Sequence, residues 1–132
     1  MEYRLLDAIL AQMFVFAFER LETWQLSSDL VERIYKLTRG FPMDEKFGLA
    51  QQIRRAAISI SSNLAEGSGR MSKKDQAHYF NMAFSSLMEV LNQLMLARRI
   101  EYIKTNELQE VRKDIELLSR KIAALRNAAL KP

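Results

Sequence analysis

The side chains best suited to chemistry recur at steps of three and four residues in one short stretch, which places them on one face of a helix. They are Gln52, Arg55, Ser59, Asn63 and Glu66. A carboxylate, an amide and a guanidinium on one face could bind a polar ligand or move a proton. No second carboxylate stands at helical spacing from Glu66, so we expect a structural row that hydrogen-bonds between helices or subunits.

Other reactive side chains are scarce. Ser61 and Ser62 lack the glycine-bracketed turn that exposes a serine nucleophile. The chain has no cysteine, which excludes disulfides, thiolate zinc sites and a cysteine nucleophile. His78 is its one histidine, so a single chain cannot build a multi-histidine metal site. We therefore expect no catalytic residue, no metal and no cofactor, and hence a protein that is not an enzyme.

Positive charge gathers in the second part of the chain. The net charge is +4, but residues 1–53 carry six Lys/Arg against eight Asp/Glu, and residues 54–132 carry fourteen against eight. Clustered cations of this kind could contact the phosphates of RNA or DNA, or form an ordinary solvated face. The candidate contacts are Arg70, Lys73, Lys74, Arg98, Arg99, Arg112, Lys113, Arg120 and Lys121.

The Gly67–Arg70 segment is a weaker signal. It is rich in glycine and precedes a helix, where backbone N–H groups favour phosphate. Its spacing matches neither nucleotide-binding glycine motif, so a phosphate-backbone contact and an ordinary exposed turn both remain open.

The elements that position these residues are four amphipathic helices. They are expected over Thr23–Arg39, over Asp44–Glu66 with a break at Gly67–Gly69, from Ser72 as N-cap to Arg99–Tyr102, and from Thr105 or Asn106 as the N-cap of the last helix. The last has the clearest apolar stripe, Leu108, Val111, Ile115, Leu118, Ile122, Leu125 and Ala129. Short connections between such helices predict an all-α, antiparallel up-down-up-down four-helix bundle over residues 18–132.

Residues 1–17 form an apolar N-terminal extension to that domain. The run is shorter than the roughly 20 residues that span a bilayer, and it lacks the features of a signal peptide. Three interpretations stay open: a short helix that covers an apolar surface, a segment that touches a membrane, or a start placed upstream of a true start at Met13.

The helical stretch also carries a family resemblance. The chain resembles the 23S rRNA intervening-sequence protein family of bacterial four-helix-bundle proteins, over about residues 18–128, at Leu21–Gln25, Phe41–Pro42, Phe47–Leu49, Gln52–Ala57, Ser59–Ile60, Ser62–Asn63 and Ala65–Gly67. Further matches are Lys73–Lys74, Tyr79–Phe80, Ala83, Ser86–Leu87, Glu89 and Gln93–Leu94. Leu91 stands where a second glutamate is common in the family, which weakens any site that would use both acids.

The resemblance implies a cytoplasmic protein that forms rings of five bundles, associates with nucleic acid and has no defined activity. A related protein type is the accessory subunit of diversity-generating retroelements, which binds a reverse transcriptase. The small side chains of Ala56, Ser59, Ser62 and Asn63 also indicate close helix approach and a homo-oligomer. We therefore expect a non-enzymatic oligomer that binds RNA or a nucleoprotein through basic residues, with a protein-interaction scaffold as the alternative and no membrane partner.

Overall fold

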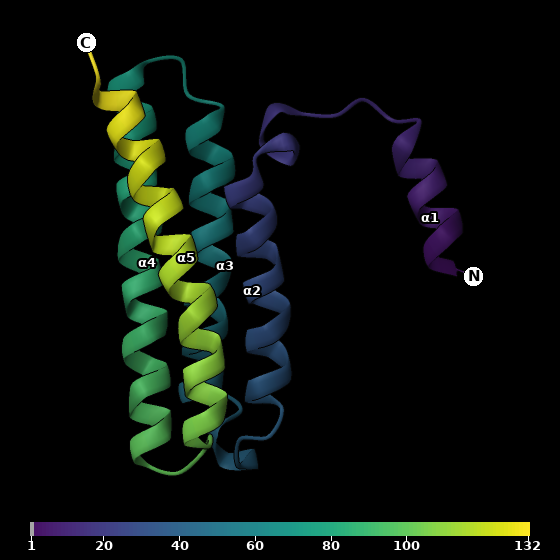
Figure 1. The fold of residues 1–132 in the computed structure, drawn as a ribbon. Coiled ribbons are helices and arrows are strands. Elements are labelled where there is room, and N and C mark those ends of the chain that lie inside the picture. The colour runs from purple at the N-terminus through teal and green to yellow at the C-terminus, as the bar shows by residue number, and fades with distance from the viewer. Residues whose placement is uncertain (1) are drawn as a thin grey trace.

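Four long helices lie antiparallel and form a bundle (Figure 1). The structure is a computed structural model that describes residues 2–132. Its elements are α1 (Glu2–Ala11), the 3-10 helix η1 (Ala17–Arg20), α2 (Glu22–Thr38), the 3-10 helix η2 (Met43–Glu45), α3 (Leu49–Ser68), α4 (Lys73–Arg99) and α5 (Thr105–Leu130). The expected all-α antiparallel bundle is confirmed. No helix among these described residues combines the length and apolarity that a membrane span requires.

The core follows the apolar periodicity of α3 and α5. In α3 the apolar residues at steps of three and four are all buried, namely Ala50, Ile53, Ala57, Ile60 and Leu64. In the predicted stripe of α5 only Leu108 and Leu125 remain partly exposed. The buried face of α4 is wide, because this helix packs against both α3 and α5. Phe84 and Leu91 are only partly buried there, whereas the smaller Ala83, Val90 and Ala97 are fully buried.

The predicted start of α3 at Asp44 is wrong. Asp44 and Glu45 belong to η2, which Pro42 precedes, and α3 begins at Leu49. Gly48 separates the two elements, since its backbone (φ −107°, ψ −119°) is not helical. The two carboxylates therefore lie outside the first turn of α3.

The predicted helix break at Gly67–Gly69 is confirmed, since α3 ends at Ser68 and Gly69 is its C-cap. Gly67 is buried and faces α4, where an added β-carbon would lie 2.9 Å from a ring carbon of Phe80. Its role is therefore close packing between two helices. The expected N-cap at Ser72 is confirmed, since Ser72 Oγ accepts a hydrogen bond from the Asp75 backbone N–H at 3.0 Å.

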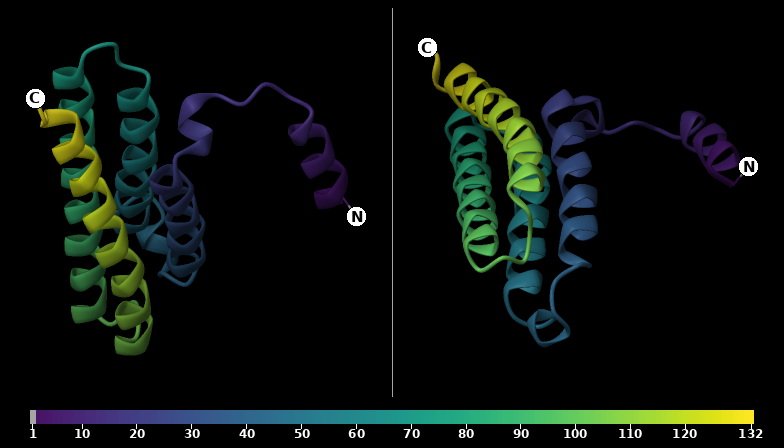
Figure 2. Two further views of the ribbon diagram at one scale, coloured as in Figure 1. Left: turned by 45° about the horizontal axis from the view of Figure 1, so that its top comes forward. Right: turned by 60° about the horizontal axis from the view of Figure 1, so that its bottom comes forward.

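The N-terminal helix α1 stands apart from the bundle and contacts none of its helices (Figures 1 and 2). Leu5, Leu6, Ile9 and Leu10 are each at least half exposed on it. Within its own chain α1 therefore covers no apolar surface. The bundle proper begins at η1, which packs on α2 and α3, with the rings of Phe18 and Trp24 5.0 Å apart.

Candidate nucleic-acid interface

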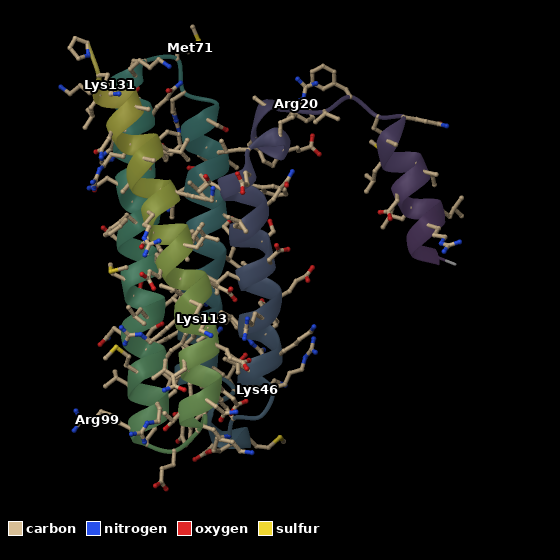
Figure 3. The ribbon with its side chains drawn as sticks, viewed as in Figure 1. Arg20, Lys46, Met71, Arg99, Lys113 and Lys131 are labelled. Carbon is tan, nitrogen blue, oxygen red and sulfur yellow. The ribbon has the colours of Figure 1, made fainter. Side chains whose placement is uncertain are left out.

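The nine candidate phosphate contacts lie at separate places on the bundle. Lys73 and Arg99 are the first and last residues of α4, a helix of 27 residues, and are therefore roughly 40 Å apart. Figure 3 shows this separation, with Met71 beyond one end of the bundle and Arg99 at the other. Arg70, Lys73 and Lys74 therefore form a group apart from Arg98 and Arg99.

The basic residues of α5 are interleaved with acids. Arg120 pairs with Glu116 one turn earlier, and Lys121 Nζ lies 3.2 Å from Glu22 Oε2 of α2. On the same side, Arg33 of α2 bridges Glu110 (3.2 Å) and Asp114 (2.6 Å). The surface shared by α2 and α5 therefore has mixed sign, and it attracts polyanions less than a run of free cations would.

The α3–α4 end of the bundle carries several exposed cations beside the exposed acids Glu66 and Asp75. Arg70, Lys73 and Lys74 are exposed there, and Lys131, which follows α5, lies at the same end of the bundle as Met71 (Figure 3). We call these four residues the end cluster. None of them forms an ion pair with a carboxylate among residues 4–132. The N-terminus of α4 adds partial positive charge at the same place.

Arg70 is held in a defined position within the end cluster. Its guanidinium carbon lies 4.3 Å from the centre of the Tyr79 ring, and its Nη2 donates to the Tyr79 hydroxyl. The side chain of Gln76 donates to the Arg70 backbone carbonyl at 2.9 Å. A guanidinium fixed in this way loses less conformational entropy when it binds an anion.

The predicted polar row divides into a bonded part and an exposed part. Ser59 Oγ lies 2.9 Å from Ser86 Oγ of α4, and Asn63 Nδ2 donates to the backbone carbonyl (2.9 Å) and the hydroxyl (3.1 Å) of Ser59. Gln52, Arg55 and Glu66 are exposed. Among residues 4–132 Glu66 has no ion pair, so within one chain neither Arg55 nor another described cation pairs with it.

The sequence predicted a role for Arg55 in the polar row but none for its neighbour Arg54. Arg54 Nε donates to the buried Thr38 hydroxyl at 2.8 Å, and its guanidinium carbon lies 4.5 Å from the centre of the Tyr35 ring. Arg54 directly follows the buried Ile53, which places it at the edge of the core stripe. This position beside the core stripe is the sequence feature that could have indicated that Arg54 packs against α2.

The described residues hold no group of three or more histidine, cysteine, aspartate or glutamate side chains that could bind a metal ion. The interface candidates are therefore the end cluster and the other exposed cations, whose chemistry is electrostatic contact with anions.

Comparisons with known proteins agree on the family and the fold. The family model for the 23S rRNA-intervening sequence protein matches residues 19–124. A crystal structure of a protein of unknown function from the S23 ribosomal protein family of Bacteroides thetaiotaomicron superposes with a TM-score of 0.73 at 23% identity. The match covers 79% of this chain and 97% of that one. No curated protein sequence matches the chain.

Proposed function

The chain belongs to the 23S rRNA-intervening sequence protein family, and from that premise we propose that it is a non-enzymatic, oligomeric binding module for RNA or a nucleoprotein. The observation that carries the proposal is the end cluster, whose four cations lack carboxylate partners within residues 4–132. Lysine and arginine side chains free of local partners can replace the counterions of a phosphate backbone.

The expected mode is contact with phosphates rather than with bases. The end cluster lies at the α3–α4 connection, in the first turn of α4 and after the end of α5, so its cations do not line the side of a helix that could lie in a groove. Phosphate contacts position a nucleic acid without reading its sequence. Binding should therefore depend strongly on salt and weakly on base sequence.

Oligomer formation is the second part of the proposal. Met88, Met95 and Leu96 of α4 and its C-cap Ile100 are exposed apolar side chains, at 37–51% relative exposure. Exposed apolar side chains on a bundle helix favour association with another copy or another protein when they form a contiguous patch. We propose a homo-oligomer, with the ring of five that the family resemblance implies, in which several end clusters would act together on one polyanion.

The test replaces Arg70, Lys73 and Lys74 by glutamine and measures fluorescence anisotropy of labelled RNA and DNA over about 50–200 mM salt. We expect weaker binding and a flatter slope of log K against log salt, by roughly 0.7–0.9 for each phosphate that the variant no longer neutralises. Arg120→Gln with Lys121→Gln is the matched control, because these two cations already have carboxylate partners. Absence of binding by the wild-type protein at about 50 mM salt would exclude the nucleic-acid role.

A protein-interaction scaffold is the second candidate, for example an accessory subunit of a reverse transcriptase. The observation in its favour is α1, whose exposed Leu5, Leu6, Ile9 and Leu10 pack on no other element of their own chain.

Light scattering tests the oligomer directly. A monomer mass at micromolar concentration would contradict both the ring and the multivalent mode of binding.

A further inference from the structure

A second concentration of positive charge lies at the opposite end of the bundle from the end cluster. The connection from α2 to α3 borders a cavity of about 260 Å³. Three cations line it, namely Arg39, Lys46 and Arg54. In Figure 3, Lys46 lies near one end of the bundle and Met71 beyond the other.

The position of Arg54 is set by two contacts. Its Nε donates to Thr38 Oγ1 at 2.8 Å, and Thr38 Oγ1 donates in turn to the Ile34 carbonyl at 2.7 Å. The Tyr35 ring supports the guanidinium at 4.5 Å. Because Nε is used internally, the two Nη groups remain to donate to a ligand, and their planar arrangement matches an oxyanion.

No carboxylate lines this cavity, and Arg39, Lys46 and Arg54 take part in none of the ion pairs among residues 4–132. The nearest acids in the sequence, Asp44 and Glu45, are not among its lining residues. Glu45 lies against Gly48, where its Oε1 would be 2.7 Å from an added β-carbon. Three cations without partners around one cavity favour a ligand of two negative charges.

The other walls limit the size and character of that ligand. Phe41, Pro42 and Met43 give the cavity an apolar side, against which a ring or an aliphatic group could rest. Its volume lies just below the roughly 300–1,000 Å³ of pockets that enclose drug-sized molecules. The cavity therefore suits a small anion, or the charged end of a larger molecule whose remainder stays in solvent.

We propose that Arg39, Lys46 and Arg54 form a binding site for a phosphate monoester. Arginine fits two phosphate oxygens at once, and lysine adds a compact charge to the same group. The phosphate could come from a free metabolite such as a nucleoside monophosphate, or from the 5′ end of an oligonucleotide. This site is independent of the end cluster, because different residues at the other end of the bundle form it.

Isothermal titration calorimetry on the full chain tests the site with five probes: inorganic phosphate, adenosine monophosphate, adenosine, and one short oligonucleotide with and without a 5′-phosphate. We expect adenosine monophosphate to bind and adenosine not to bind. A preference for the 5′-phosphorylated oligonucleotide over the monophosphate would assign the source to nucleic-acid ends, and the reverse would assign it to free metabolites. Failure of every phosphate probe to bind at millimolar concentration overturns the proposal.

Substitutions test which side chains bind the phosphate. Lys46→Gln and Arg39→Gln should each weaken adenosine monophosphate binding by about tenfold or more, as expected when one charged hydrogen bond is removed. Arg55→Gln is the matched control, since Arg55 adjoins Arg54 in sequence but does not line the cavity. Arg54→Lys keeps the charge and removes the planar donors, and a thermal melt checks that it folds.

Equal weakening by Lys46→Gln and Arg55→Gln would mean non-specific attraction and would overturn the site. The variant that lacks Arg70, Lys73 and Lys74 should keep full affinity for adenosine monophosphate. This site and the proposed role of the end cluster can therefore fail separately.

Discussion

Gly67 of α3 and Phe80 of α4 are packed so closely that a β-carbon at position 67 would lie 2.9 Å from Cε1 of Phe80. It would also lie 2.9 Å from Cβ of Tyr79, an atom that no side-chain rotation can move away. We expect Gly67→Ala to lower the free energy of unfolding by about 1–3 kcal/mol through overpacking. The better helix propensity of alanine, about 1 kcal/mol, offsets only part of this cost.

Urea unfolding monitored by circular dichroism measures this effect. Gly69→Ala is the control, because a β-carbon there would meet its nearest atom, the Glu66 carbonyl oxygen, at an ordinary 3.6 Å. We expect that variant to stay within about 0.5 kcal/mol of the wild type. Equal effects of the two substitutions would contradict the close approach of α3 and α4 at Gly67.

Ser59 and Ser86 join the same two helices through their hydroxyl groups, 2.9 Å apart. Replacing either serine by alanine leaves the other without this partner, at an expected cost of about 1 kcal/mol. Replacing both should cost less than the two single changes together, because no unpaired group remains. A double-mutant cycle in urea measures the coupling, with Ser62→Ala as an exposed control. Strict additivity would show that the bond contributes nothing.

Glu66 is exposed near the C-terminal end of α3, where the helix dipole disfavours negative charge. Because it has no ion pair within residues 4–132, Glu66→Gln should leave the thermal unfolding temperature unchanged or slightly raised. A fall in this temperature that coincides with a smaller mass by light scattering would instead show that Glu66 pairs with a neighbouring subunit. That result would support the interface role predicted for the polar row.

Tyr102 follows α4 and packs on Phe41, with the ring centres 5.3 Å apart. Burial, followed by the charges of Glu45 and Asp44, raises the pKa of the Tyr102 phenol. The folded protein therefore holds this proton more tightly than the unfolded chain does. The contribution of Tyr102 to the free energy of unfolding is fully present below the ordinary tyrosine pKa of about 10. It is lost as the pH rises through the pKa of the folded state.

Tyr102→Phe removes this pH-dependent contribution. The difference in urea midpoint between the wild type and the variant should therefore become smaller, or reverse, above about pH 10 compared with neutral pH. Urea titrations of both proteins at the two pH values measure it. A difference in urea midpoint that is the same at both pH values would contradict the raised pKa of Tyr102.

The helix α1 contacts none of the other elements, so it should add nothing to the stability of the bundle. A chain that starts at Met13, the alternative start, keeps η1 and all four bundle helices. We expect its thermal unfolding temperature to match that of the full chain at low protein concentration. A lower temperature together with a smaller mass would show that α1 packs on another subunit, and an equal mass with a lower temperature would contradict its independence.

The helices and most of their buried faces could be predicted from the amino-acid sequence. The stripe from Leu108 to Ala129 and the cap at Ser72 depend on residues three or four positions apart, and that spacing is fixed once the chain is helical. For the same reason the periodicity placed Ser59 and Asn63 on one face, where they are hydrogen-bonded.

Which of these faces meet depends on the tertiary fold. Arg54 and Arg55 are indistinguishable by type and adjacent in sequence, yet only Arg54 reaches Thr38 and the α2–α3 cavity. Gly67 belongs to the segment that ends α3, as predicted, but its close contact with Phe80 of α4 appears only in the fold. Whether a glycine ends a helix or admits a neighbour, and which cations gather at one end, depends on contacts between residues far apart in the chain, and helical periodicity carries no information about those contacts.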